Sequence, residues 1–226
     1  MSYFSQEFNN FFIELSANNN KEWFHLNKNR YETEVKNPFQ TFVIDLIAEV
    51  NKYKPLSLEP KKAIFRINND IRFSKLKTPY KTHVGAIIAT NGTKNNNGDG
   101  LYIHLSPGEC YIGGGLYQLE KNDLYKIRNY ITNNLVEFNI LLNDKNFRKY
   151  FDGFATSEVN KIIPKEFIES AIKQPLIYNK QFYFMKVFDD GSTFLKDNQL
   201  LESTINYFKA LIPWQAFFLK ALSQTP

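Results

Sequence analysis

The chain has 226 residues, and its content of 43% hydrophobic and 16% aromatic residues is typical of a folded globular protein rather than a disordered one. The single cysteine, Cys110, excludes an internal disulfide and any zinc site built from several cysteines. The net charge is only +5, no apolar run is long enough to span a membrane, and the first residues lack the features of a secretory signal. These properties predict a cytoplasmic protein without a membrane segment.

Helices are predicted at the start of the chain. Phe8, Phe11, Phe12 and Leu15 follow the spacing of one helical face and predict a helix over residues 5–17. Asn20 is a suitable N-cap for a second helix that runs to about residue 34. The stretch from 39 to about 53 continues the apolar stripe beyond an interruption expected at residue 38, which is a proline.

Strands are predicted in the middle of the chain, because apolar and polar residues alternate from residue 65 to 74. A second strand is expected over 80–90, where the turn-rich stretch NGTKNNNGDG ends it, and a hairpin over 101–106 and 110–112. Helices are expected again over 121–133, 164–173 and 198–222, with one more strand over 182–188. The pattern predicts a single α+β domain over 1–226, with an antiparallel sheet of about five strands covered by helices from both ends. The abundance of asparagine is interpreted as a feature of composition without a function.

One stretch combines the predicted strand with an excess of positive charge. Residues 65–83, FRINNDIRFSKLKTPYKTH, are called the basic segment below. Its five cations outweigh a single acid and supply most of the net charge: Arg66, Arg72, Lys75, Lys77 and Lys81. A local positive patch on a structured segment predicts an anion site, and a solvated edge strand protected by lysines is the alternative.

Three charged residues of the basic segment would share one face of a strand. Asp70 lies between Arg66 and Arg72 and could orient both guanidinium groups toward a phosphate or carboxylate. A plain ion network on the sheet surface is the alternative. Lys75, Lys77 and Lys81 surround a turn stiffened by proline, which is a suitable phosphate clamp.

Histidine supplies the candidates for proton transfer. His83 and His104 fall on neighbouring predicted strands, and His104 would share a face with Tyr102. A histidine held by hydrogen bonds in the core is the alternative for each. No histidine, cysteine or carboxylate spacing supports a metal, so we expect neither a metal nor another cofactor.

A run of three glycines, residues 113–115, leads from a strand toward a helix. Such a loop can direct backbone N–H groups at an anion, which makes Gly113 and Gly114 candidate ligands. Close packing of the backbone is the alternative and is slightly favoured. The run lacks the lysine of a Walker A loop and the spacing of a dinucleotide fold, and no GxSxG elbow occurs in the chain.

Four stretches together resemble a known family: NNNKEWF, the basic segment, LYIHLSPGE and YIGGGLY. The chain resembles the bacterial domain-of-unknown-function 2461 family over essentially its whole length, a resemblance that implies no particular activity. Members of that family carry an arginine before the aspartate and an acidic residue in the Ser-Lys-x-Lys turn, where this chain has Asn69 and Leu76. The remaining motif positions match: Arg66, Asp70, Arg72, Phe73, Lys77, Tyr80 and Lys81.

The first functional hypothesis is an enzyme that acts on a phosphorylated or otherwise anionic small molecule. Arg66, Arg72 and Lys81 would bind the anion, Asp70 would orient them, and His83 or His104 would transfer a proton. The second is a nucleic-acid-binding module that uses the same cations, with Tyr80 or Tyr102 stacking on bases. The third is a scaffold without a ligand. A compact basic cluster favours a pocket over the long basic track that nucleic acid needs.

Overall fold

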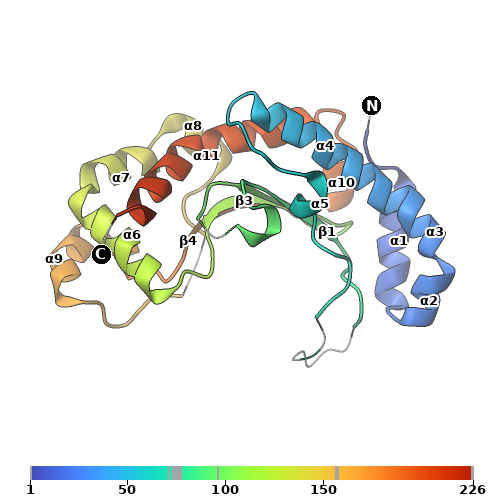
Figure 1. The fold of residues 1–226 in the computed structure, drawn as a ribbon, viewed down its shortest axis with the longest axis horizontal. Helices are drawn as coiled ribbons and strands as arrows, with labels where there is room; N and C mark the ends of the chain where they lie inside the picture. The colour runs from blue at the N-terminus through green and yellow to red at the C-terminus, as the bar shows by residue number, and fades with distance from the viewer. Residues whose placement is uncertain (1, 71, 73–77, 96, 156–157, 225–226) are drawn as a thin grey trace. The chain divides into compact units, whose positions relative to one another are not determined.

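The computed structural model describes residues 2–70, 72, 78–95, 97–155 and 158–224. Lys75 and Lys77, two of the candidate anion ligands, lie outside the described residues. The described part of the chain forms helices and one antiparallel sheet (Figure 1). The sheet has the strand order β1-β2-β3-β4, with β1 at Val84–Ile88, β2 at Leu101–Leu105, β3 at Cys110–Leu116 and β4 at Phe182–Phe188. The α+β class is therefore confirmed, with four strands instead of about five.

The predicted strand over residues 65–74 accounts for the difference. Its described residues make only one isolated antiparallel bridge, Asn68 with Tyr80, and the residue before it, Ile64, makes another with Ala86. The apolar alternation indicated a strand, but nearly every second side chain is charged or an amide, and these side chains are exposed or half-buried. A segment with so little apolar surface to bury gains little from joining the sheet.

The chain divides into two compact units, which are described separately. The first comprises Met1–Thr93, Tyr102–Ile112 and Val187–Asn206, and the second Lys94–Leu101, Gly113–Lys186 and Tyr207–Pro226. None of the described helices has the length and apolar character that crossing a membrane requires.

The helices of the first unit begin as the sequence indicated. Helix α1, Gln6–Ala17, buries the predicted phenylalanine face, and α2, Lys21–Leu26, begins at Asn20, whose Oδ1 accepts a hydrogen bond from the Trp23 N–H at 2.9 Å. Helix α3, Lys28–Tyr31, continues through a π-helical turn, Glu32–Lys36, into α4, Asn37–Asn51. The predicted interruption at Pro38 is wrong, because this proline lies in the first turn of α4, where its missing N–H is tolerated. The unit also contains α5, Pro60–Ala63, and α10, Gly191–Leu195.

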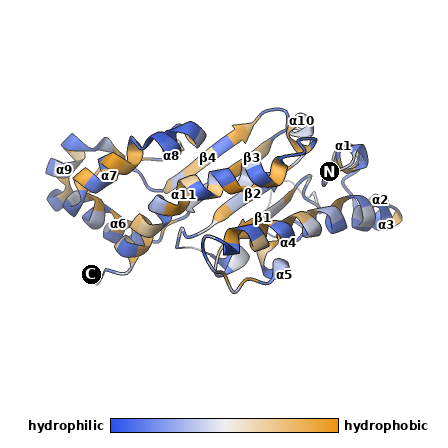
Figure 2. Cartoon of the chain, turned by 90° about the horizontal axis from the view of Figure 1, so that it is seen from above, coloured by the Kyte–Doolittle hydropathy of each residue, from blue (hydrophilic) through white to orange (hydrophobic). Residues whose placement is uncertain are grey.

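The second unit is helical around an aromatic core. It contains α6 at Lys121–Asn133, α7 at Leu135–Leu142, α8 at Lys145–Tyr150 and α9 at Ile168–Lys173, with 3-10 turns at Lys165–Phe167 and Pro175–Tyr178. Helix α11, Leu200–Leu222, alternates hydrophilic and hydrophobic residues along its length (Figure 2). In this unit it buries Phe208, Leu211 and Trp214 while Lys220 stays exposed, as expected for an amphipathic helix.

Candidate functional site

The described residues on either side of the turn in the basic segment pair with each other. The N–H of Lys81 donates to the Ile67 carbonyl at 2.8 Å, and the N–H of Asn69 donates to the Pro79 carbonyl at 2.9 Å. The Asn69 side chain adds a bond to the Thr78 carbonyl at 3.0 Å. The two described arms therefore run side by side (Figure 1). Pairing between the arms places Asn68 opposite Tyr80.

Asp70 binds one of its two predicted arginine partners. Its carboxylate accepts two hydrogen bonds from the Arg72 guanidinium, at 2.6 and 2.9 Å, and a longer one from the Arg72 backbone N–H. These hydrogen bonds hold the pKa of the Asp70 carboxyl well below its usual range, with a smaller contribution from the charge of Arg66. The Arg66 side chain makes no hydrogen bond or ion pair with any residue that the structure describes. Asp70 therefore orients Arg72 but does not orient Arg66.

Replacing Arg72 with methionine is expected to change the melting temperature little. The side chains of Arg72 and Asp70 are 75% and 42% exposed, and an exposed ion pair contributes little because water screens both charges. Thermal melts of the wild-type and variant proteins test this. A large decrease in melting temperature would mean that the pair holds the segment together.

The two candidate histidines lie against each other in the first unit. The ring centroids of His83 and His104 are 3.9 Å apart, with 24° between the planes. The Tyr102 hydroxyl lies 3.2 Å from Nδ1 of His104, and the Tyr111 ring contacts that of His104 edge-on, with centroids 4.7 Å apart. The proximity expected from adjacent strands is thus found, and the catalytic role of the pair stays a prediction.

Both imidazoles are neutral at pH 7. Burial lowers the pKa of His83 to about 3, with further lowering by His104 and Lys81, and burial lowers that of His104 to about 4. A neutral imidazole can accept a proton, although one with such a low pKa is a weak base. Lys81 itself donates to the Arg66 carbonyl at 2.6 Å, and burial lowers its pKa.

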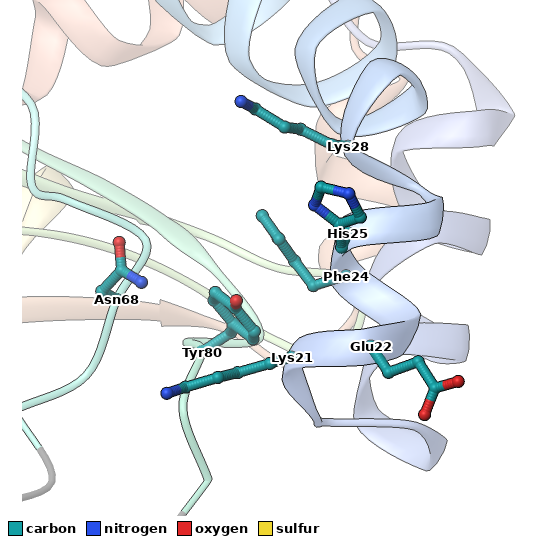
Figure 3. A pocket seen from close by; sticks show the side chains of 7 residues that line it. All are labelled: Lys21, Glu22, Phe24, His25, Lys28, Asn68 and Tyr80. Atoms are coloured by element: carbon teal, nitrogen blue, oxygen red, sulfur yellow. The ribbon is translucent and has the colours of Figure 1, made fainter.

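A concave surface opens between α2 and the basic segment. The depression has a volume of about 540 Å³, within the range of small-molecule sites, and is lined by Lys21, Glu22, Phe24, His25, Lys28, Asn68 and Tyr80. Figure 3 shows the side chains of Lys21, Lys28, Asn68 and Tyr80 around the open space, whereas Glu22 points away from it. We call this feature the α2 depression.

Tyr80 is held firmly in the wall of the α2 depression. Its ring stacks on that of Phe24, with centroids 3.9 Å apart and 14° between the planes. The Asn19 side chain accepts a hydrogen bond from the Tyr80 N–H at 3.1 Å and donates one to its carbonyl at 2.8 Å. The residues from α2 were missed by the sequence analysis, which treated NNNKEWF only as part of the family resemblance. Two lysines seven positions apart, close to an aromatic residue, were the available signal.

The glycine run is part of a strand and not a loop before a helix. Gly113 and Gly114 lie inside β3, between β2 and β4. A Cβ atom on Gly113 would lie 2.5 Å from the Phe184 carbonyl oxygen, and one on Gly114 would lie 2.6 Å from Leu211 Cδ1. Such close approaches support the packing role over anion binding by these two residues.

Neither a cysteine nucleophile nor a histidine- or carboxylate-rich metal centre emerges from the described residues. Cys110 is buried, and burial raises the pKa of its thiol to about 11, which keeps it protonated. Within the described ranges, no group of three or more histidine, cysteine, aspartate or glutamate residues is placed to hold a metal.

These features define an α+β protein whose candidate functional side chains lie on the basic segment, in the histidine pair and on α2. The chain matches the family model described as conserved hypothetical protein (DUF2461) over residues 7–217, and it belongs to that family. No curated protein and no solved structure matches it.

Proposed function

We propose that the protein binds an anionic small molecule, one that carries a phosphate or carboxylate group, in the α2 depression. The observation that carries the proposal is that Lys21 and Lys28 both line one concave surface (Figure 3). Asn68 and Tyr80 line the same surface with an amide and a hydroxyl group, and both groups can donate hydrogen bonds to anion oxygens.

The charge of the depression suits an anion. Two ammonium groups face the space, and the carboxylate of Glu22 is directed elsewhere (Figure 3). Lysine binds phosphate as a compact charge with three donors, and such interactions strengthen where part of the surrounding water is displaced. The stacked Tyr80 and Phe24 rings give the site a rigid wall, which limits the loss of side-chain entropy on binding.

In its more specific form, the proposal is that the protein is an enzyme that acts on the bound anion. His83 and His104 belong to the same unit as the depression, and Tyr80 is separated from His83 by only two residues. A negatively charged ligand near the imidazoles would raise their pKa values toward neutrality, because it favours the charged form. Binding of the anion would then prepare the pair for proton transfer.

A nucleic-acid-binding role receives less support. Lys21 and Lys28 line a concave surface, which suits a small molecule better than the long basic track that nucleic acid needs. One face of the Tyr80 ring is covered by Phe24, so only the other face is left for a base.

Inorganic phosphate and pyrophosphate are expected to raise the melting temperature of the wild-type protein. A ligand at ten times its dissociation constant stabilises the folded state by about 1.4 kcal/mol. The Lys21→Gln/Lys28→Gln variant should lose this stabilisation, and Lys61→Gln, which removes an exposed lysine elsewhere in the same unit, should keep it. Thermal melts and calorimetric titration at fixed ionic strength measure both effects.

Two results would contradict the proposal. One is equal stabilisation of the wild-type and double-variant proteins, which would place the anion elsewhere. The other is a stronger, salt-sensitive affinity for single-stranded DNA than for either phosphate compound, which would favour the nucleic-acid role.

A further inference from the structure

The asparagine-rich loop before β2 has the spacing of a cation-binding loop. The sequence NNNGDG at residues 95–100 places Asn95, Asn97 and Asp99 at alternate positions, followed by Gly100. The first half of the twelve-residue calcium loop has the same spacing, D-x-[DN]-x-[DN]-G, with side-chain oxygens at its first, third and fifth positions. The one departure in these six positions is asparagine in place of aspartate at the first.

Two of these oxygens are shielded from water without a hydrogen-bond donor. The Oδ1 atoms of Asn95 and Asn97 are buried, and neither accepts a hydrogen bond from any residue in the described part of the chain. Asp99 adds a carboxylate that is only 4% exposed. The two buried asparagine oxygens need a partner that compensates their lost hydration, and an ordered water or a cation can supply it.

The backbone holds these oxygens in place. Gly98 has a φ of 72°, a conformation that favours glycine, and a Cβ atom there would lie 2.9 Å from Leu116 Cδ2. The Gly100 carbonyl oxygen lies 2.7 Å from the position of a Cβ on Gly114. Gly98 and Gly100 therefore lie close to β3 within the second unit, and the small residues on both sides permit this close approach.

We propose that Asn95, Asn97 and Asp99 bind one hard divalent cation through their side-chain oxygens, with calcium preferred to magnesium. A set made only of oxygens, without histidine or cysteine, suits hard cations rather than zinc or copper. Calcium accepts six to eight oxygens in a flexible arrangement, so backbone carbonyls and water can complete its coordination. Magnesium requires a nearly ideal octahedron, which this short loop is less suited to provide.

The affinity is expected to be low. Only one of the three ligands is charged, and the position that holds a bidentate glutamate in the twelve-residue loop is Ser106 here. The Ser106 hydroxyl donates to the Glu109 carbonyl at 2.7 Å. Loops with few charged ligands bind calcium with dissociation constants of roughly 10⁻⁴–10⁻³ M.

Calorimetric titration of the full chain with calcium chloride at constant ionic strength tests the site, with thermal melts as a second measurement. We expect a dissociation constant of roughly 10⁻⁴–10⁻³ M for calcium, weaker binding of magnesium, and a melting temperature that rises with calcium. Asp99→Asn and Asn97→Ala should each weaken calcium binding by about tenfold or more, because the first removes the negative charge of the site and the second removes one of its side-chain oxygens. Asn91→Ala, at an exposed position before the 3-10 turn Gly92–Lys94, should bind like the wild type.

Absence of any calcium effect on the folded wild-type protein would overturn the proposal and leave ordered water as the partner of the buried oxygens. Equal calcium binding by the wild-type, Asp99→Asn and Asn97→Ala proteins would overturn it as well. Magnesium binding as tight as that of calcium would overturn the preference for calcium. Asn97→Ala keeps the test decisive if Asp99→Asn does not fold, because its loss of an uncharged oxygen leaves the buried carboxylate unchanged.

Discussion

Lowering the pH from 7 to 5 is expected to reduce the free energy of unfolding by about 2–3 kcal/mol, through His83 and His104. Each imidazole is held neutral in the folded protein, with a pKa of about 3 or 4 instead of 6.5. In the unfolded chain both rings take up a proton as the pH falls through 6.5, whereas in the folded protein they do not. The unfolded state therefore binds more protons across this window, and stability decreases as the pH decreases.

The magnitude follows from the two shifts. A histidine whose pKa falls from 6.5 to well below 5 loses about 2 kcal/mol of stabilisation between pH 7 and pH 5. Water still reaches part of each ring and screens the interaction, so the expected effect of the pair is smaller than the sum. Above pH 7 both rings are neutral in either state and contribute no pH dependence.

Urea unfolding at pH 7 and pH 5 measures the effect in a window above the usual pKa of carboxylates. The His83→Gln/His104→Gln variant should show little pH dependence there. His25→Gln, which removes the third histidine of the chain, is the control variant. Nuclear magnetic resonance gives a measurement without substitution, since the signals of His83 and His104 should not titrate between pH 7 and pH 5. Titration of both of these signals near pH 6.5 would contradict the prediction.

The proximity of His83 and His104 could be predicted from the sequence because a strand appears as a local pattern of alternating residues. Alternation placed His104 on the face of Tyr102, and β2 has that register. The strand predicted over 80–90, which was to include His83, was wrong in its extent, since β1 spans only Val84–Ile88. The 3.9 Å stacking of the two rings depends on how neighbouring strands meet, which one sequence does not specify.

The α2 depression could not be predicted from the sequence either, because it also depends on how distant segments meet. Lys21 and Lys28 look like ordinary surface lysines of a helix, and only the approach of Asn68 and Tyr80 from about 50 positions further along the chain makes them part of a concave surface. The asparagine-rich loop was missed for a different reason. Its spacing is visible in the sequence, but the sequence analysis attributed the asparagines to composition. Only the burial of the Asn95 and Asn97 oxygens distinguishes it from a simple turn.

Replacing Trp214 with alanine is expected to lower the free energy of unfolding by about 3–5 kcal/mol. The Trp214 side chain is 1% exposed at the centre of the aromatic core of the second unit. Its ring centroid lies 5.0 Å from that of Phe184, 5.1 Å from that of Phe154 and 5.4 Å from that of Phe138. Large rings on several sides cannot all move into the vacated space, so a cavity remains and adds to the lost burial.

The Trp214→Phe variant distinguishes the contribution of packing to stability from that of the indole N–H. Nε1 of Trp214 makes no hydrogen bond to a described residue, so the substitution removes no such bond and keeps most of the volume. A cost below about 1.5 kcal/mol is expected for this variant. Val136→Ala, at a position 75% exposed in the same unit, should change stability by less than about 0.5 kcal/mol.

The same variants test whether residues 1–226 unfold as the single domain that the sequence predicts. Trp23, the other of the two tryptophans, lies in the first unit and is the only tryptophan left in Trp214→Phe and Trp214→Ala. If the chain is one cooperative domain, the midpoint seen by Trp23 fluorescence should fall in Trp214→Ala by the same roughly 6–20 °C as the midpoint seen by circular dichroism. The contrary result is a Trp23 fluorescence midpoint that is the same in Trp214→Ala as in Trp214→Phe, while the circular dichroism midpoint of Trp214→Ala is lower. It would show that the two units unfold independently and that the single-domain prediction is wrong.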